Sequence, residues 1–378
     1  MDIQFTDEQE LLRSSIQRLL RDQYDFDTRR KIIATEEGWS RKHWDGFAEL
    51  GLLAAPFPEE FGGLGAGPLA SMIIMQEFGR NLVVEPFFET IVLAGGVIEQ
   101  AGSSAQREEF LPEIAGGKTT WALAWAERGS RYDLNNVTTV AARHGDEYVL
   151  SGDKAAVIGG PWANKLIVSA RTSGDPRDRG GVSLFIVDRQ SANLHLQSFK
   201  TIDARRAAEI TLGGVRVPAS RMLGEEGTGV AILEACRDRA IAALCAEAVG
   251  IITALNEATL NHLKTRKQFG VPIGNFQALQ HRMADMFIAA EQARSMAVIA
   301  AVYADSDAAA ERRRAVSGAK AYIGQAARLV GQQAVQMHGA MGVVDDLIVS
   351  HYFKRLTMID MSLGDVDFHL ARFSDALA

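Results

Sequence analysis

Cationic, aromatic and amide side chains crowd one short stretch, residues 264–285, which reads KTRKQFGVPIGNFQALQHRMAD. Arg266 and Phe269 precede a Gly-Val-Pro-Ile-Gly break, and Gln277 follows it. An Arg guanidinium can hold a pyrophosphate through paired hydrogen bonds, and a Phe ring can pack on a base or a sugar edge. The pattern therefore indicates either an anion-binding corner or a helix-loop-helix corner with solvated basic residues.

Long apolar repeats of helical period lie on both sides of this stretch. We expect a helix that ends at Gly270, a turn at Pro272 and a new helix with Asn275 as its N-cap. Such a corner would present Arg266, Phe269 and Gln277 at one end of a helix pair.

This corner resembles the RKxFGxxIxxFQ segment of the flavin-dependent acyl-CoA dehydrogenases. In that family the Arg, the Phe and the Gln reach across a subunit interface to the ADP half of a neighbour's FAD. The resemblance implies that Arg266, Phe269 and Gln277 are cofactor-binding residues.

A second stretch, residues 336–342, is similar to the QxxGGxG segment of the same family. There a helix end and exposed backbone N–H groups meet the partner's FAD pyrophosphate. The resemblance implies this role for Gln336, Gly339 and Ala340, the last in place of the second glycine. A helix C-cap at Gly339 would explain the same glycine without a ligand.

Composition and charge narrow the class of protein. The 378 residues are 47% hydrophobic and 23% charged, as in ordinary globular proteins, and the net charge of −7 argues against a nucleic-acid partner. Cys236 and Cys245 fall in one predicted helix, so we expect no disulfide framework and a reducing cytoplasm. The N-terminal MDIQFTDEQELL lacks the features of a signal peptide, and we expect no apolar run near the roughly 20 residues of a membrane span.

Periodicity along the chain predicts helices, then strands, then helices. Thr6 and Gln9 form a capping-box signature before a helix, and further helices are expected over 41–50 and 68–78. Turns at 144–146 and 151–153 separate short β segments, and helices follow over 231–263, 275–304, 308–338 and from about 349. We predict an α+β protein with an N-terminal helical domain (1–117), a small central β domain (118–228) and a C-terminal four-helix bundle (229–378), the order seen in acyl-CoA dehydrogenases.

The flavin-ring contacts of that family are missing from the matching segments. Its TEPGxGSD turn is represented by residues 126–133, AERGSRYD, and its KxWITN strand by 154–159, KAAVIG. Two hydroxyl positions are thus Ala126 and Tyr132, the flavin-stacking Trp is Ala156, and a hydrogen-bonding Thr is Ile158. We expect Glu127, Gly129, Asp133 and Lys154 to keep only the backbone framework of this site.

The catalytic base also departs from the family pattern. In the family a glutamate removes the α proton of the acyl-CoA thioester while the β hydrogen leaves as hydride to the flavin. The matching position is Leu363 or Gly364, and the alternative position found in some members is Ala240. Asp365 and Asp238 lie nearby, and Asp365 is a candidate for a displaced base. We predict that the chain has no catalytic base of its own.

The resemblance implies FAD as the cofactor and an acyl-CoA as the substrate. The segments that would contact a neighbour's FAD are kept, whereas the flavin-ring contacts and the catalytic base are lost. We therefore expect the small subunit of a heteromeric acyl-CoA dehydrogenase, assembled with a catalytic large subunit as α2β2. The complex would pass its electrons to electron-transfer flavoprotein. Residues 24–26, 127–128, 131–134 and 351–360 are similar to small subunits of pimeloyl-CoA dehydrogenases. Two alternatives are a self-sufficient homotetramer and a flavin-free structural subunit.

Overall fold

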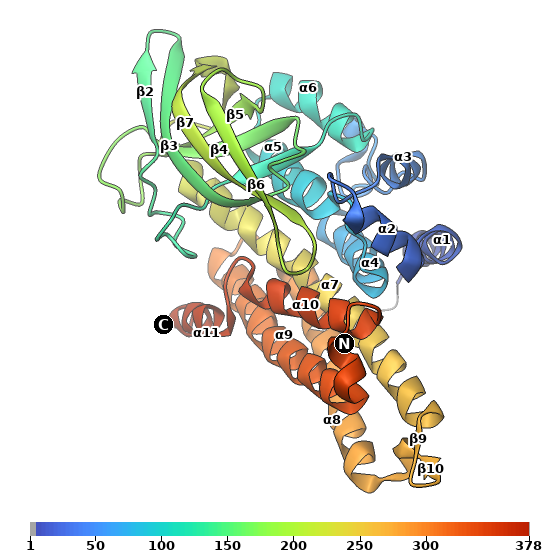
Figure 1. Ribbon diagram of the computed structural model, residues 1–378. Helices are drawn as coiled ribbons and strands as arrows, with labels where there is room; N and C mark the ends of the chain where they lie inside the picture. The colour runs from blue at the N-terminus through green and yellow to red at the C-terminus, as the bar shows by residue number, and fades with distance from the viewer. Residues whose placement is uncertain (1–4, 378) are drawn as a thin grey trace. The chain divides into compact units, whose positions relative to one another are not determined.

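A computed structural model describes residues 5–377. The chain divides into two compact units, which are described separately here. Within the described residues, one unit, the helical unit, comprises residues 5–31, 68–83 and 241–377, and the other, the sheet unit, comprises residues 32–67 and 84–240. Along the chain the order is an N-terminal helical domain, a middle β-sheet domain and a C-terminal helical domain, as predicted (Figure 1).

The N-terminal helices begin with a confirmed capping box, in which Thr6 accepts a hydrogen bond from the Gln9 N–H and the Gln9 side chain accepts from the Thr6 N–H. In this first helix Ile16 and Leu20 are buried, whereas Leu11 is 67% exposed. The helices before the sheet are α1 (Asp7–Gln23), α2 (Phe26–Ala34), α3 (Arg41–Glu49), η1 (Glu59–Phe61), α4 (Gly67–Asn81), the π-helix η2 (Phe88–Gly95), α5 (Gly96–Ala101) and α6 (Ser104–Ala115).

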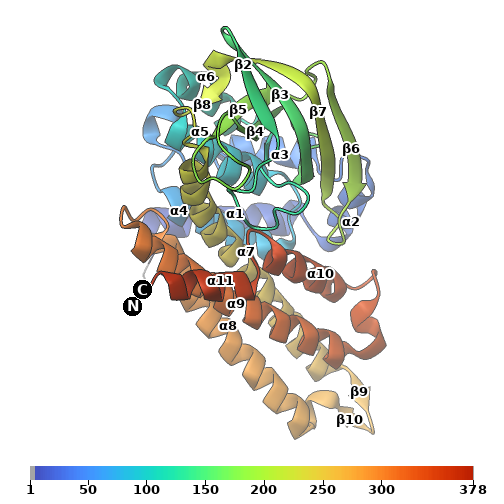
Figure 2. The same ribbon diagram turned by 90° about the vertical axis from the view of Figure 1, so that its left-hand side faces the viewer.

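The middle domain is an eight-stranded sheet with strand order β6-β7-β3-β2-β4-β5-β8, and β1 pairs with β4 in parallel. Figure 2 shows β2, β3, β7 and β6 side by side in this order. The strands are β1 (Trp121–Ala124), β2 (Val140–His144), β3 (Glu147–Ile158), β4 (Lys165–Arg171), β5 (Val182–Asp188), β6 (Leu194–Lys200), β7 (Arg206–Pro218) and β8 (Met222–Leu223). The short 3-10 helix η3 (Ala219–Arg221) connects β7 to β8.

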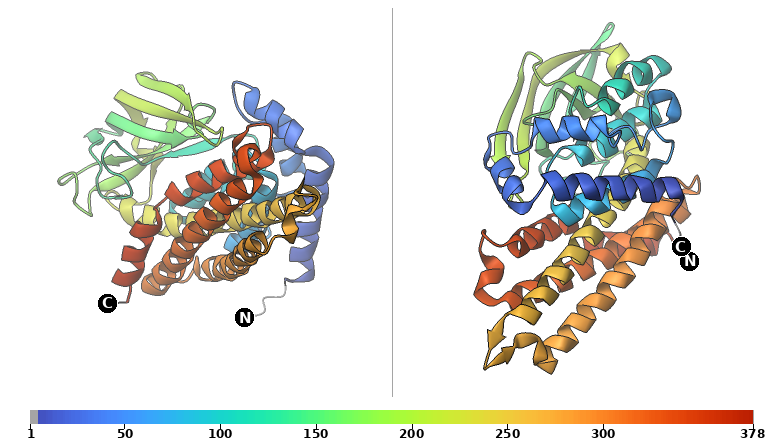
Figure 3. Two further views of the ribbon diagram at one scale, coloured as in Figure 1. Left: turned by 60° about the horizontal axis from the view of Figure 1, so that its bottom comes forward. Right: turned by 90° about the vertical axis from the view of Figure 1, so that its right-hand side faces the viewer.

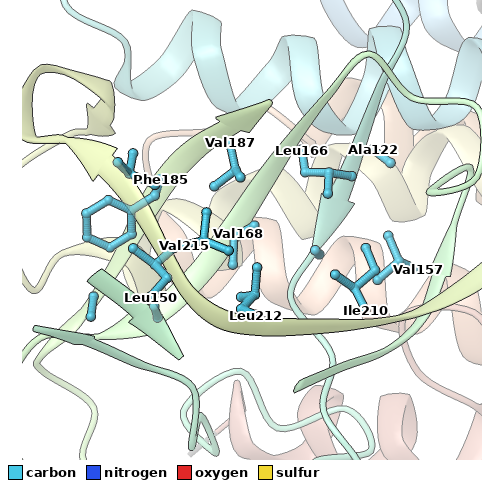
Figure 4. Packing of buried hydrophobic residues seen from close by; sticks show 14 of the residues in the cluster. Ala122, Leu150, Val157, Leu166, Val168, Phe185, Val187, Ile210, Leu212 and Val215 are labelled. Carbon is cyan, nitrogen blue, oxygen red and sulfur yellow. The ribbon is translucent and has the colours of Figure 1, made fainter. Parts of the chain in front are cut away.

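Alternating apolar residues of these strands meet in one buried core. Leu150, Leu166, Phe185 and Val215 are fully buried in this cluster (Figure 4). The predicted hairpin turn at 144–146 joins β2 to β3, where Val140 pairs with Ser151.

The predicted turn at 151–153 was wrong, because these residues lie inside β3. Gly152 is needed there for close approach, since a Cβ would lie 2.6 Å from the Thr139 Cα. The register of β3 against β7 shifts between Leu150 and Ser151, which marks a β-bulge next to Gly152. This bulge lets the strand continue through the glycine that the sequence alone predicts to be a turn residue.

Long helices build the C-terminal domain, and Figure 3 shows two of them running side by side and joined by a short hairpin at one end. Their bounds are α7 (Gly229–Thr265), β9 (Lys267–Gln268), β10 (Val271–Pro272), η4 (Ile273–Asn275), α8 (Gln277–Tyr303), α9 (Ala309–His338), η5 (Gly339–Val343), α10 (Ile348–Met361) and α11 (Val366–Asp375). The single final helix expected from about 349 is wrong, because the chain breaks into α10 and α11 at a turn where Leu363 and Gly364 have positive φ.

Glycines set the crossing of α4 and α7 in the helical unit. A Cβ on Gly79 would lie 2.1 Å from the Glu247 carbonyl oxygen, and one on Gly250 would lie 1.9 Å from the Gln76 carbonyl oxygen. The two helix backbones therefore touch at this crossing, which no larger residue allows.

Helix α7 corrects one expectation. It contains an 18-residue window with a mean hydropathy of 1.5, and by length and composition it could cross a membrane. Within the described residues 89% of that window is buried, so α7 is a core helix. Cys236 and Cys245 are both buried in α7 as free thiols, and burial raises the pKa of each to about 12.

Candidate cofactor-binding site

The corner at residues 264–277 is built as a hairpin between two helices. Helix α7 ends at Thr265, five residues before the predicted end at Gly270, because Lys267 and Val271 enter the paired strands β9 and β10. The Ile273 N–H donates to the Arg266 carbonyl at 2.8 Å and closes the base of the hairpin. Arg266 is exposed directly after the helix end.

The chain reverses at Phe269 and Gly270, and the turn predicted at Pro272 was wrong. Both Phe269 (φ +53°) and Gly270 (φ +81°) have positive φ, which is the requirement of a two-residue type I′ hairpin turn. Glycine meets this at no cost, but a bulky side chain in this region is a strained outlier. The Phe269 side chain is 91% exposed and meets the edge of the Phe276 ring at 6.1 Å between centroids.

Gln277 is the first residue of α8 and is exposed. The N-cap is Phe276, which makes no side-chain cap hydrogen bond, and the prediction of Asn275 as the N-cap was wrong because Asn275 belongs to the 3-10 turn η4. The Gln280 side chain instead donates to the Gly274 carbonyl at 2.8 Å and fastens this turn to the helix.

The second predicted segment lies at the end of α9. Gly339 is the C-cap, with φ +61° and ψ −141°, a conformation open almost only to glycine. Gln336 and Ala340 are exposed on either side of it, and the Gly339 N–H donates to the Gln336 carbonyl. The helix C-cap is therefore real, and it leaves backbone exposed where the resemblance expects a pyrophosphate.

A pair of histidines joins the two segments. The His262 ring, one turn before Arg266, stacks on the His338 ring, directly before Gly339, with 4.3 Å between centroids and 26° between planes. His338 Nδ1 lies 2.8 Å from the Ala334 carbonyl oxygen, so this nitrogen carries the proton and donates. Burial, His338 and Arg266 together lower the pKa of His262. Two segments 70 residues apart in sequence thus form one end of the helical unit.

Sequence reasoning missed both histidines as contributors to this site. His338 stood inside the matched segment, and His262 lies at the i−4 position from Arg266, on the same side of the helix. A guanidinium, an exposed aromatic ring, amide side chains and a glycine-rich helix end are the groups that bind a dinucleotide diphosphate.

The flavin-ring positions in the sheet unit also come together. The Ala155 N–H donates to the Ala126 carbonyl at 2.8 Å, so the 126–133 turn lies against β3. Ala156 is exposed with φ +50° at a register shift of β3 against β7. Strand β3 has a bulge at this position. The side chains of Ala126, Ala156 and Ile158 carry neither an aromatic ring nor a hydroxyl group that could contact a flavin.

The framework beneath these positions is a buried ion pair. Lys154 Nζ lies 2.6 Å from Glu127 Oε1 and 3.1 Å from Ser169 Oγ, and the Thr138 and Thr139 N–H groups donate to the Glu127 carboxylate. Burial raises the pKa of Glu127, but the Lys154 ammonium and the hydrogen bonds outweigh it and hold the pKa at about 2. Burial lowers the pKa of Lys154 to about 8.

The turn between α10 and α11 contains the position that matches the family's catalytic base. Hydrogen bonds from buried side chains hold this turn in place. The buried Lys320 ammonium donates to the Asp360 carbonyl at 2.9 Å and to the Gly364 carbonyl at 2.7 Å. His369 Nε2 lies 3.2 Å from the Leu363 carbonyl oxygen. Asp365 is the N-cap of α11, and its carboxylate accepts from the Phe368 N–H at 2.9 Å. The side chains at 363 and 364 carry no group that accepts a proton.

Three family profiles match nearly the whole chain. They are the acyl-CoA dehydrogenase N-terminal domain over residues 6–118, the middle domain over 122–215 and the C-terminal domain over 227–377. The chain belongs to the acyl-CoA dehydrogenase family, whose members are FAD-dependent oxidoreductases acting on acyl-CoA substrates.

Among its relatives is the probable acyl-CoA dehydrogenase YngJ of Bacillus subtilis, 30% identical over 84% of each chain. Among solved structures, a variant of the Tcur3481–Tcur3483 steroid ACAD is 30% identical, with a TM-score of 0.88 over 98% of both chains. The ChsE4–ChsE5 complex from Mycobacterium tuberculosis is 25% identical, with a TM-score of 0.88 over 100% of this chain and 99% of that one.

Proposed function

We propose that this chain is the small, base-less subunit of a heteromeric acyl-CoA dehydrogenase and that it donates the ADP-side wall of a FAD site held by a partner subunit. The observation that carries the proposal is the His262–His338 stack, which assembles the two donor segments on one end of the helical unit. The eroded ring positions and the turn at Leu363 support the same division of labour.

Each donor residue has a distinct role in this proposal. Arg266 pairs with the pyrophosphate through its guanidinium, and Phe269 offers its exposed ring to the adenosine. Gln277 and Gln336 hydrogen-bond to the ADP half through their amides, while the exposed backbone of Gly339 and Ala340 approaches the phosphates. All six residues are exposed, as a contact to another chain requires.

The receiving half of a flavin site fits this chain poorly. A ring held against Ala156 and Ile158 would lose aromatic stacking and a hydroxyl hydrogen bond, and no carboxylate stands at 363 or 364. The partner would therefore supply the isoalloxazine cleft and the glutamate that takes the α proton of the acyl-CoA. FAD bound in that cleft would accept the hydride.

Assembly as α2β2 with a large acyl-CoA dehydrogenase subunit follows from this division. Two structural relatives, the Tcur3481–Tcur3483 ACAD and the ChsE4–ChsE5 complex, are each described by two chain names, which supports a two-chain assembly. The resemblance of residues 351–360 to pimeloyl-CoA dehydrogenase small subunits favours a dicarboxylic acyl-CoA, and the steroid ACAD favours a bulky side-chain thioester. We place the complex in the cytoplasm with electron-transfer flavoprotein as its electron acceptor.

The test is flavin content and native mass, measured on the chain alone and after co-expression with each large acyl-CoA dehydrogenase chain of the same genome. We expect a colourless lone chain and a complex with one FAD per heterodimer. In that complex Arg266→Ala and Gln336→Ala should lower FAD retention roughly tenfold or more, because each removes hydrogen bonds to a charged group.

Two other outcomes would replace the proposal. A yellow homotetramer that bleaches with an acyl-CoA, and no longer does so in Asp365→Asn or Asp238→Asn, would establish a self-sufficient enzyme. The N-cap role of Asp365 argues against this. Unchanged flavin content in Arg266→Ala and Gln336→Ala would instead establish a flavin-free structural subunit.

A further inference from the structure

The loop that follows α9 has a histidine at each of its ends. This donor loop, residues 339–347, begins at Gly339 and leads into α10. His338 stands directly before it and stacks on His262. His351 follows it in the first turn of α10 and is 9% exposed. Two histidines thus border the segment that the proposed function places at the FAD phosphates.

His351 joins the donor loop to α2. Its Nε2 lies 2.9 Å from the carbonyl oxygen of Asp345, a residue of the loop. Its Nδ1 lies 3.0 Å from Arg29 Nη1, and Arg29, only 2% exposed, also donates through Nε to the Leu82 carbonyl at 2.9 Å. The Phe26 ring meets the imidazole at an edge, with 5.1 Å between centroids. The imidazole therefore connects the loop to a helix near the start of the chain.

These contacts define the protonation state of His351. A guanidinium only donates hydrogen bonds, so Nδ1 accepts from Arg29 and carries no proton. Nε2 then carries the proton and donates to the Asp345 carbonyl. A proton on Nδ1 would set two cationic nitrogens 3.0 Å apart and would break the hydrogen bond to Arg29. The link between α2 and the donor loop therefore requires a neutral imidazole.

Two ion pairs also hold the end of the loop, but both are exposed. Arg30 on α2 pairs with Asp346 at 2.7 Å, and 43% and 81% of the two side chains are exposed, so this pair adds one charge of each sign. Lys354 on α10 pairs with Asp345 at 2.5 Å, and 35% and 75% are exposed. Exposed pairs stabilise little, because water screens their charges and long side chains lose freedom. The buried contact of the imidazole is therefore the main link between α2 and the loop.

The groups around His351 oppose its protonation. Burial lowers the pKa of His351 from its ordinary 6.5, and the charges of Arg29 and Lys354 lower this pKa further. The hydrogen bond to Asp345 and the charge of that residue act in the opposite direction without reversing the shift. Because the pKa is lowered, the link is intact above pH 6.5 and is lost as the pH falls below 6.5 through the shifted pKa.

We propose that Arg29 and His351 form a positioning clamp, which holds the donor loop in the shape that meets the FAD phosphates and breaks when His351 takes up a proton. The inference rests on the proposed function and adds two positioning residues and a pH dependence to it. Neither residue touches the cofactor, and each acts through the loop. Retention of FAD by the complex should therefore fall in mild acid.

The test compares the wild type with His351→Asn in the lone full chain. The Asn oxygen takes the place of Nδ1, accepts from Arg29 and does not titrate. Between about pH 7.5 and pH 5, hydrogen exchange of residues 339–347, corrected for intrinsic rates, should become roughly tenfold faster in the wild type and about threefold at most in His351→Asn. His195 is exposed on β6, so His195→Asn is the matched control and should behave as the wild type.

The same variants are then measured in the complex with the large subunit. Retention of FAD should fall roughly tenfold over this pH range in the wild type and His195→Asn, and clearly less in His351→Asn. The His262–His338 pair is present in all three proteins, so the difference belongs to position 351. Urea unfolding at about pH 7.5 verifies that each variant is folded.

Equal acceleration of exchange in the wild type and His351→Asn would overturn the clamp. Different exchange combined with identical pH profiles of FAD retention would overturn its role in positioning the loop for the cofactor. Arg266→Ala separates this inference from the proposed function. If its flavin content is unchanged, the proposed function fails, and exchange in the lone chain still decides whether the clamp exists.

Discussion

Leu363 and Gly364, at the position of the family's catalytic base, shape the turn between α10 and α11. Gly364 has φ +123°, and a Cβ there would lie 2.4 Å from Phe368 Cδ1 and 2.5 Å from His369 Nε2. Leu363, at φ +57°, already bears a side chain in the left-handed region and is half-buried. Only position 363 could therefore accept a glutamate without moving the turn.

We predict that Gly364→Glu lowers the free energy of unfolding by about 2–4 kcal/mol, because it adds both backbone strain and overlap. Leu363→Glu should lower it by about 1 kcal/mol or less. Urea unfolding of the two variants measures the difference. Equal losses at both positions would contradict this account of the turn.

A second residue-scale prediction concerns acid. The pKa of Glu127 is held at about 2, below its ordinary 4.5, so its stabilising contribution is complete above pH 4.5 and is lost as the pH falls from 4.5 towards 2. Glu127→Gln should remove that part of the acid dependence and leave Lys154 buried without its charge partner, at a cost of about 3–5 kcal/mol at pH 7. Unfolding measured from pH 7 to 3 checks both effects.

The matched control is Glu209→Gln. Glu209 pairs with the largely exposed Arg128 at 3.3 Å, and such surface pairs contribute about 1 kcal/mol or less. If Glu209→Gln lowered the free energy of unfolding as much as Glu127→Gln does, burial of the ion pair would not explain the cost of the Glu127 substitution.

At the scale of elements, the positive φ of Phe269 strains the β9–β10 hairpin and lowers its stability. Asn tolerates positive φ far better than Phe and is favoured in type I′ turns. We predict that Phe269→Asn raises the stability of the lone chain by about 0.5–1 kcal/mol and lowers FAD retention in the complex. Thermal unfolding and flavin absorbance measure the two effects.

Phe199→Asn serves as the control for this change. Phe199 is also exposed, lies on β6 and is not among the residues with positive φ, so its replacement should bring no gain in stability. A gain at Phe199, or none at Phe269, would remove strain as the explanation.

At the scale of the whole molecule, charge is unevenly distributed. The net charge is −7, yet the 27 residues from 258 to 284 hold four lysines and arginines, namely Lys264, Arg266, Lys267 and Arg282, and no Asp or Glu. We predict that raising NaCl from about 0.05 to 0.5 M lowers FAD retention by the complex several-fold, because exposed charges are screened over the Debye length. In Arg266→Gln the salt dependence should be shallower, and an unchanged slope would remove Arg266 from the phosphate contact.

The sequence by itself determined the family, the helix–sheet–helix order and the start of α1. These depend on local signals, namely apolar periodicity, turn residues and the Thr6 capping box, which act within a few residues of the chain. It also singled out the segments around Arg266 and Gln336, because their residue types carry the resemblance.

Tertiary contacts decided the rest. Gly152 reads locally as a turn but is a strand residue pressed against Thr139. The pairing of Lys267 and Gln268 with Pro272 and Val271, directly after α7, is a second feature that periodicity does not register. The juxtaposition of the two donor segments depends on the His262–His338 contact. A pairing between residues 76 positions apart follows from how the helices pack, and helix packing is a property of the folded chain rather than of any window of its sequence.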